Sequence, residues 1–310
     1  MTACRIVITE FMDESAVQRL RQQHHVLYDP TLVDQPGALL AEAPMADALV
    51  VRNRTQVRGS LLAALQRCRV IGRLGVGLDN IDLPACEQRG MQVIPATGAN
   101  AASVAEYTIA SALLLLRGAY QASADVAAGL WPRAALSHGR EVGGKVMGIV
   151  GFGDIGRLTA RLAAGLGMQP VAWRGRREAS DPLFAEAGVR ALTLDELLAE
   201  ADVVSLNLPL TPQTRGLFDA TRIAAMKPGA VLVNTARGGI VDERALAAAL
   251  REGRLGGAAL DVFEAEPLPA SAHFQGCPNL LLTPHVAGVT QEANQRVSGM
   301  IAEAVLRALG

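Results

Sequence analysis

The chain has 310 residues, of which 50% are hydrophobic and 19% are charged, so it can bury a sizeable core and is not a disordered chain. At roughly 100–200 residues per domain, this length predicts two domains. Lysine and arginine together number 29, aspartate and glutamate 30, and only 4% of the residues are aromatic. This composition offers neither a basic surface nor stacking platforms, so we expect no nucleic-acid partner and no membrane partner.

The sequence carries no sign of export or of a membrane span. Its longest strongly apolar run, residues 109–116, is far shorter than the ~20 residues of a transmembrane helix. The N-terminus predicts a β-strand rather than a signal peptide. The four cysteines are scattered without a CxxC pair, so we expect no disulfide framework and no metal site. These features predict a cytoplasmic protein.

Short β-branched runs alternate with Ala- and Leu-rich helical stretches along nearly the whole chain, which predicts parallel sheets covered by helices. The expected strands are residues 5–9, 48–51, 70–73, 92–95, 146–151, 170–173, 202–207, 230–234, 257–261 and 280–283. The clearest expected helices are residues 13–23, 101–117, 155–166, 243–252 and 291–309.

About ten strands exceed one comfortable open sheet, so we expect an α/β protein with two doubly wound parallel-sheet domains. The break between them falls near residues 95–99, just before the long helix 101–117. If the last helix packs back on the first domain, that domain is discontinuous. The expected domains are then residues 1–99 plus 287–310, and an inserted domain of residues 100–286.

The sharpest local signal is Gly-x-Gly-x-x-Gly at residues 151–156, between an apolar strand and a helix. In this setting the first glycine makes the tight turn and the second lets the backbone approach a pyrophosphate. The third allows close helix–strand packing, and the helix N-terminus binds the anion. The turn predicts a dinucleotide site whose residues are Gly151, Gly153, Asp154, Ile155 and Gly156.

The end of the next strand indicates which dinucleotide is bound. An NAD site usually places Asp or Glu here, about twenty residues on, to hold the ribose hydroxyls. This chain has Arg174 and Arg176, and no acid before Glu178. Arginines suit the 2′-phosphate of NADP through charge-assisted hydrogen bonds, so we favour NADP, with NAD and a merely solvated basic loop as alternatives.

Three later segments place polar residues just beyond a strand: residues 233–243, 259–267 and 282–288. Ligands bind at such positions in doubly wound sheets. Together with residues 72–82, residues 100–107 and the glycine turn, these segments resemble the D-2-hydroxyacid dehydrogenase family, most closely its phosphoglycerate dehydrogenase branch. The resemblance covers nearly the whole chain. It implies a Rossmann nucleotide-binding domain inserted in a flavodoxin-like substrate domain, and NAD(P)-dependent interconversion of a small D-2-hydroxy acid and its 2-keto acid.

The resemblance implies Arg237, Glu266 and His285 as the catalytic set. Hydride transfer at C2 needs a group that exchanges the hydroxyl proton, and histidine suits this because its pKa lies near neutrality. Glu266 would hold the imidazole in one tautomer and favour its protonated form. Arg237 would clamp the carboxylate and carbonyl oxygens and polarise the ketone.

The resemblance also implies further cofactor contacts, at Pro209, Thr235, Ala236, Asp261 and Gly288. Asp261 would lie near the nicotinamide carboxamide. The alternative for this residue is a cap at the end of its strand.

Substrate recognition is expected in the first domain. The loop after strand 48–51 carries Arg52 and Arg54, which would suit a second anionic group on the substrate, or form a hydrated surface pair. The turn at Val76 and Gly77 could offer backbone N–H groups to the substrate carboxylate, which Arg237 would also hold. Arg52 and Arg54 favour phosphoglycerate or sulfolactate as the substrate. Arg174 instead favours NADPH as the cofactor, and with it a hydroxypyruvate or glyoxylate reductase. All of these substrates remain open.

A different class is also possible by resemblance, because transcriptional co-repressors that sense nucleotides use the same scaffold. The sequence shows no disordered extension at either end, so we do not expect a co-repressor. It leaves no room for the serine-binding regulatory domain of some phosphoglycerate dehydrogenases, so we do not expect that domain. A homodimer is expected by resemblance, through the helix 101–117 and an arm at residues 118–139.

Overall fold

The computed structural model describes residues 3–270 and 273–310. Met1 and Thr2, before the first expected strand, and Ser271 and Ala272 lie outside the described residues. The chain divides into two compact units. Unit 1 comprises Met1–Asn100 and Val289–Gly310, and unit 2 comprises Ala101–Gly288.

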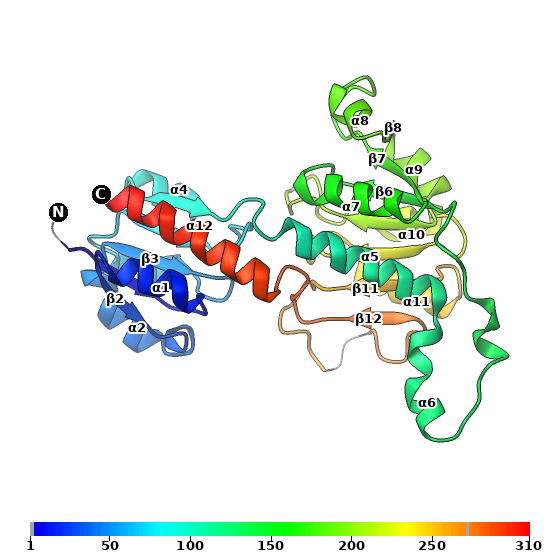
Figure 1. Cartoon of the computed structure of the whole chain (residues 1–310), viewed down its shortest axis with the longest axis horizontal. Coiled ribbons are helices and arrows are strands. Elements are labelled where there is room, and N and C mark those ends of the chain that lie inside the picture. Colours follow the sequence, from blue (N-terminus) through cyan, green and yellow to red (C-terminus); the bar gives the residue numbers. More distant parts are fainter. Residues whose placement is uncertain (1–2, 271–272) are drawn as a thin grey trace. The chain divides into compact units, whose positions relative to one another are not determined.

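Unit 1 is built on a five-stranded parallel sheet (Figure 1). The strand order is β2-β1-β3-β4-β5, which is the flavodoxin-like order. The strands are β1 (Arg5–Ile8), β2 (His25–Tyr28), β3 (Ala48–Val51), β4 (Val70–Arg73) and β5 (Gln92–Pro95).

Helices cover both faces of this sheet because successive strand residues point to opposite sides. Ile6 and Ile8 pack with helices α1 (Glu14–Arg21) and α12 (Gln291–Leu309). Val7 packs on the other side, where the helices are α2 (Pro36–Glu42), α3 (Gly59–Ala64) and α4 (Leu83–Gln88).

The terminal helix α12 belongs to unit 1 because it lies directly on β4. A Cβ added at Gly72 would lie 2.7 Å from Ile301 and 3.1 Å from Val305. The absence of a side chain at Gly72 therefore lets the C-terminal helix pack closely on the sheet.

Unit 2 is built on a seven-stranded parallel sheet in the order β12-β11-β10-β9-β6-β7-β8. The strands are β6 (Val146–Val150), β7 (Gln169–Trp173), β8 (Arg190–Leu192), β9 (Val203–Leu206), β10 (Val231–Asn234), β11 (Gly257–Leu260) and β12 (Leu280–Leu282). This is the Rossmann order with a seventh strand added, and the chain changes direction across the sheet between β6 and β9. Dinucleotides bind at the carboxyl ends of the strands at this switch point.

The helices of unit 2 form two layers. One core lies under α5 (Ala101–Arg117), α7 (Asp154–Gly165) and α8 (Pro182–Glu186). The other lies under α9 (Leu194–Glu200), α10 (Ala220–Ala225) and α11 (Glu243–Arg251). Local chemistry sets the helix starts: Thr193 and Glu196 form a capping box at α9, and Asp242 caps α11.

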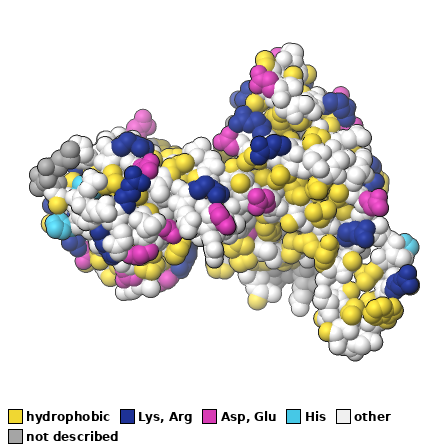
Figure 2. Space-filling view, viewed as in Figure 1, with side chains coloured by type: hydrophobic (Ala, Val, Ile, Leu, Met, Phe, Trp, Pro, Cys, Tyr) yellow, Lys and Arg dark blue, Asp and Glu magenta, His cyan; other side chains and the backbone are white. Residues whose placement is uncertain are grey.

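The segment between α5 and β6 carries the short helix α6 (Ser123–Ala127). Its apolar side chains are unusually exposed, with Trp131 at 78%, Tyr120 at 60% and Leu130 at 57%. Figure 2 shows hydrophobic side chains gathered on this segment. The segment therefore presents apolar surface that the rest of this chain does not bury.

The structure confirms the expected fold class of two doubly wound parallel-sheet domains. All ten expected strands form, each within one residue of the expected bounds. The two strands that the sequence did not reveal, β2 and β8, lie at sheet edges and are only partly buried, so their hydrophobic pattern is weak. Across residues 3–270 and 273–310, no helix combines the length and the apolar character needed to span a membrane.

Candidate active site

The glycine turn joins β6 to α7, and its glycines are required for different reasons. Gly151 has φ +105°, and a Cβ there would lie 2.4 Å from the carbonyl oxygen of Asn207. A Cβ at Gly156 would lie 2.2 Å from the carbonyl oxygen of Gly151. A Cβ at Gly153, the N-cap of α7, would meet no protein atom within 4 Å. The open space at Gly153 lies at the helix N-terminus, where a pyrophosphate binds.

Two buried polar atoms near this turn support a cofactor site. Within the described residues, Asn207 Oδ1 and Thr235 Oγ1 have no hydrogen-bond partner. Asn207 follows β9 and Thr235 follows β10, so both lie at the carboxyl ends of neighbouring strands. Buried polar atoms normally have partners, so these two suit the polar groups of a bound dinucleotide. The sequence pointed to Thr235 but not to Asn207, which lies two residues before the expected Pro209.

The remaining expected cofactor residues lie at the same edge of the sheet. Asp154 begins α7 and pairs with Arg157 at 2.6 Å, and Ile155 follows it, half-buried. The Pro209 carbonyl accepts a bond from Thr214 (2.7 Å). Ala236 lies in the turn after β10, and Gly288 is the last residue of unit 2.

The loop after β7 presents arginine side chains. Arg174 Nη1 donates to the carbonyl of Arg177 at 3.2 Å. Across residues 3–270 and 273–310, Arg177 forms an ion pair with Asp181 (2.8 Å), and neither Arg174 nor Arg176 forms one. Arg174 nevertheless lies near a carboxylate, because the pKa of Glu196 is lowered first by its hydrogen bonds from Thr193 and then by the charges of Arg174 and Arg190.

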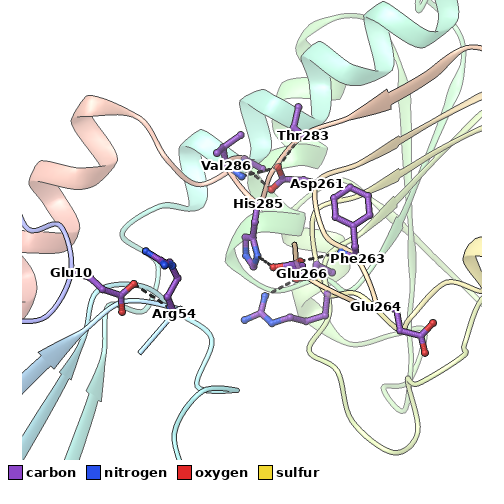
Figure 3. A network of polar contacts seen from close by, with 12 residues as sticks. Glu10, Arg54, Asp261, Phe263, Glu264, Glu266, Thr283, His285 and Val286 are labelled. Carbon is purple, nitrogen blue, oxygen red and sulfur yellow. Dashed lines mark hydrogen bonds and ion pairs between the residues drawn. The ribbon is translucent and has the colours of Figure 1, made fainter. Parts of the chain in front are cut away.

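His285 and Glu266 form a direct pair (Figure 3). His285 Nδ1 lies 2.8 Å from Glu266 Oε2, and the N–H of Phe263 donates to Glu266 Oε1 at 3.0 Å. Burial raises the pKa of Glu266, but the hydrogen bonds and the charges of His285 and Arg237 outweigh it, so this pKa is lowered overall. The carboxylate is thus ionised at neutral pH. Because an ionised carboxylate only accepts, Nδ1 carries the proton and Nε2 is available to exchange one.

Arg237 lies in the turn after β10. The side chain of Asn234, 1% exposed, accepts from Ala236 N at 3.0 Å and donates to the Arg237 carbonyl at 3.1 Å. A Cβ at Gly238 would lie 1.8 Å from the carbonyl oxygen of Phe263. Glycine at 238 thus allows the turn of Arg237 to lie against the segment of Glu266. The structure brings the three expected catalytic residues together in unit 2.

A second carboxylate supports the Glu266 segment. Glu243, the first residue of α11, is 8% exposed and accepts from the N–H of Glu264 at 2.7 Å. Its other oxygen lies 3.4 Å from His273 Nε2. From the sequence, Glu243 is only the last residue of the segment 233–243. Its position directly after an N-cap aspartate was the only local sign of a special role.

Asp261, at the end of β11, is bound by the segment that carries His285. Its carboxylate accepts from Thr283 Oγ1 (2.7 Å), Val286 N (2.7 Å) and Ala287 N (2.8 Å). The sequence predicted for Asp261 either a contact with the nicotinamide carboxamide or a cap at the end of its strand. In the structure, Asp261 has a further role, because it also links β11 to residues 283–287.

In unit 1, the loop after β3 is organised by Glu10. Glu10 is 5% exposed, and its carboxylate accepts from the N–H groups of Arg52 (2.9 Å), Arg54 (3.2 Å) and Thr55 (3.0 Å), the second of which is drawn in Figure 3. One buried carboxylate therefore fixes the backbone from which both arginines project.

The two arginines of this loop have different environments. The Arg52 guanidinium donates to the amide oxygen of Asn294 (2.7 Å), and burial lowers its pKa against the opposing charge of Glu10. The Arg54 guanidinium is exposed and pairs with Asp34, and that hydrogen bond raises its pKa. Both stay protonated at neutral pH. Arg52 is thus a partly desolvated cation with a neutral partner, and Arg54 is a surface ion pair.

The turn after β4 carries Val76 and Gly77. Val76 is 38% exposed, and Gly77 is half-buried. Gly75 has φ +155°, and a Cβ there would lie 1.5 Å from Nη1 of the buried Arg73. The Arg73 side chain therefore occupies the space beside the turn.

The described residues include no group of three or more His, Cys, Asp or Glu placed to hold a metal ion. All four cysteines carry free thiols.

Comparison with known proteins identifies the family. Residues 109–287 match the D-isomer specific 2-hydroxyacid dehydrogenase, NAD binding domain. The chain is 51% identical over 305 residues to the (S)-sulfolactate dehydrogenase of Chromohalobacter salexigens, covering 98% of each chain. It is 40% identical over 311 residues to the D-3-phosphoglycerate dehydrogenase of Mycobacterium leprae, covering 98% of this chain and 56% of that protein. A crystal structure of a glyoxylate reductase from Paecilomyes thermophila superimposes with a TM-score of 0.86 at 29% identity, covering 100% of this chain and 96% of that one.

The chain belongs to the D-isomer specific 2-hydroxyacid dehydrogenase family, and its unit 2 contains the NAD-binding domain. This confirms the expected enzyme class, an oxidoreductase that interconverts 2-hydroxy acids and 2-keto acids with a nicotinamide cofactor. The co-repressor alternative receives no support from these similarities.

Proposed function

We propose that this enzyme interconverts (S)-3-sulfolactate and 3-sulfopyruvate. The observation that carries this proposal is the 51% identity to an (S)-sulfolactate dehydrogenase, which extends over 98% of both chains. The similarity to phosphoglycerate dehydrogenase is lower, at 40%, and the chain spans only 56% of that protein. Both substrates carry an anion on C3, for which Arg52 and Arg54 are the proposed ligands.

The stereochemistry is consistent with the family. In sulfolactate the sulfur-bearing C3 outranks the carboxyl group in the naming rules, whereas in lactate the carboxyl outranks C3. The (S) label of sulfolactate therefore describes the same spatial arrangement as D-lactate. A D-isomer specific fold suits (S)-sulfolactate without any inversion of the site.

We assign proton exchange to His285. In oxidation, a nicotinamide cofactor held by the glycine turn would supply the acceptor for the hydride from C2. Nε2 of His285 takes the hydroxyl proton, and C2 and its oxygen form a double bond. Glu266 holds Nδ1 and stabilises the imidazolium that results. Arg237 binds the carboxylate and the C2 oxygen, where negative charge develops. In unit 1, the proposed substrate ligands are Val76 and Gly77 for a carboxylate, and Arg52 and Arg54 for a sulfonate.

The dinucleotide is held by the glycine turn, with Gly151, Gly153, Asp154, Ile155 and Gly156, and by the strand-end residues Pro209, Thr235, Ala236, Asp261 and Gly288. We propose NADP(H) as the preferred form, because Arg174 and Arg176 form no ion pair within the described residues and stand where an NAD site carries an acid. Arg174→Asp should lower the ratio of kcat/KM for NADPH over NADH by roughly 10-fold to 100-fold, the worth of one charge-assisted hydrogen bond. Arg177→Ala is the matched control, because Arg177 is already paired with Asp181. An unchanged ratio in Arg174→Asp would refute this assignment.

A second candidate function is reduction of hydroxypyruvate or glyoxylate. The observation that favours it is the same arginine pair, because NADPH commonly drives reduction. This alternative needs no anion at C3 and would leave Arg52 and Arg54 without a substrate role.

The experiment is a steady-state assay of reduction with NADPH and with NADH. The substrates are 3-sulfopyruvate, 3-phosphohydroxypyruvate, hydroxypyruvate and glyoxylate. We expect the highest kcat/KM for 3-sulfopyruvate, and oxidation of (S)- but not (R)-sulfolactate. Preference for the phospho acid would replace sulfonate by phosphate, and preference for an acid without the C3 anion would favour the second candidate.

We further propose a cytoplasmic homodimer that uses α5 and the exposed apolar segment around α6. The support is the exposure of Trp131, Tyr120 and Leu130, which a partner copy would cover. Sedimentation analysis tests this: the wild type should be dimeric, and Trp131→Ser should weaken the dimer.

A further inference from the structure

His285 lies between residues that are tied to Asp261. The Asp261 carboxylate is 1% exposed and accepts from Thr283, on one side of His285, and from the N–H groups of Val286 and Ala287 on the other (Figure 3). The N–H of His285 itself donates to the carbonyl of Asp261 at 2.9 Å. Four hydrogen bonds thus fix the backbone around His285.

This fixation matters because His285 has an unusual backbone conformation. Its φ is +56°, in the left-handed region that residues other than glycine rarely adopt. Such a conformation persists only when the surroundings hold it. If the bonds to Asp261 weaken, we expect the backbone at His285 to relax and the ring to move away from Glu266.

The hydrogen bonds extend one step further, to helix α5. The hydroxyl of Tyr107 lies 2.6 Å from Thr283 Oγ1. Thr283 has one hydroxyl proton, and it donates that proton to Asp261 Oδ1. Tyr107 must therefore be the donor to Thr283. Burial raises the pKa of Tyr107, which keeps it a neutral donor.

We propose that Tyr107 and Thr283 are positioning residues that hold His285 in its active geometry through Asp261. This gives Asp261 a task besides the expected contact with the nicotinamide. The proposal rests on the proposed function, because it assumes that His285 exchanges the substrate proton.

The test compares Tyr107→Phe and Thr283→Val, which delete one hydroxyl each, with Thr283→Ser, which keeps it. We expect Tyr107→Phe and Thr283→Val to lower kcat by about tenfold, the worth of one buried hydrogen bond. The KM for the cofactor should stay unchanged. The alkaline limb of the reduction pH profile should move to lower pH, because the hydrogen bond that His285 Nδ1 donates to Glu266, which stabilises the imidazolium, is formed less often. Thr283→Ser should retain most of the activity and the wild-type limb.

Melting temperatures are measured in parallel. A lower Tm in Tyr107→Phe and Thr283→Val with wild-type kcat and pH limb would show a purely structural role and overturn the proposal. A higher cofactor KM at unchanged kcat would also overturn it, because Asp261 would then act on the cofactor alone. His285→Ala in the same assay separates a failure of this inference from a failure of the assignment on which it rests. If it is inactive while Tyr107→Phe is normal, only this inference fails; if it is active, the assignment of proton exchange to His285 fails. The proposed function itself fails if the wild type does not reduce 3-sulfopyruvate.

Discussion

The loops of unit 1 and of unit 2 that carry the proposed chemistry have similar backbone support, but their functional side chains have different partners. In unit 1, buried Glu10 accepts the backbone N–H groups of Arg52 and Arg54. In unit 2, buried Asp261 and Glu243 accept the backbone N–H groups beside His285 and Glu266. In both units, buried carboxylates accept backbone N–H groups and so fix functional loops that have no regular secondary structure.

The difference lies in the functional side chains. Those of unit 2 are bound to each other, His285 to Glu266, with the charge of Arg237 acting on the same carboxylate. Those of unit 1 are bound to partners outside the loop, Arg52 to a neutral amide and Arg54 to an exposed acid. We infer that the side chains proposed to react are held in place by one another, whereas those proposed to bind the substrate must exchange their present partners for an anion.

His285→Ala is the strongest test of the paired side chains of unit 2. We expect kcat to fall by about 10²–10⁴, the usual worth of general acid–base catalysis. Stopped-flow transfer of hydride from NADPH to 3-sulfopyruvate measures this directly. Near-normal turnover would show that the proton comes from another group.

Glu266→Gln tests the pair rather than the histidine alone. We expect kcat for reduction at neutral pH to fall by roughly 10². The lowered pKa of Glu266 keeps it ionised far below neutrality, and the variant loses that negative charge beside His285. Reduction, which needs the imidazolium, should fail at lower pH than in the wild type, and oxidation, which needs neutral imidazole, should persist to lower pH. Profiles that coincide with the wild type in both directions would contradict the pairing.

The proposed recognition side chains of unit 1 are tested by Arg52→Gln, which keeps a hydrogen-bond donor on a shorter side chain but removes the charge. We expect kcat/KM for 3-sulfopyruvate to fall by roughly 10-fold to 100-fold, the worth of a charge-assisted hydrogen bond. The value for hydroxypyruvate, which lacks the anion, is the internal control and should barely change. Equal losses for both substrates would mean that Arg52 acts on the loop and not on the sulfonate.

The smallest expected effect comes from Asp34→Asn. Asp34 and Arg54 form an exposed pair, with side chains 58% and 57% exposed, and such a pair contributes about 0–1 kcal/mol. If Arg54 must leave Asp34 to bind the substrate anion, the variant should lower KM for 3-sulfopyruvate by about two- to fivefold. A raised KM would show that Asp34 orients Arg54 instead.

Much of the fold followed from local patterns. The central strands are continuous apolar runs, and the glycine turn and the long helices have strong signals of their own, so ten strands were found within a residue. Four strands lie at sheet edges, and two of them, β2 and β8, were missed; β8 has only three residues, and no residue of β2 is fully buried.

The sequence by itself determined the family, the doubly wound architecture and the chemical types of the proposed site residues, because these are written in short segments with fixed spacing. The tertiary structure decided which of them are joined. Tyr107 meets Thr283 across 176 residues of chain, and Glu243 meets Glu264 across 21. The tertiary structure also gave Arg52 and Arg54, which are two residues apart in the sequence, different environments. Arg52 is a partly desolvated cation, whereas Arg54 belongs to a surface ion pair. Such differences depend on burial and on partners brought by distant strands and helices, which no local pattern encodes.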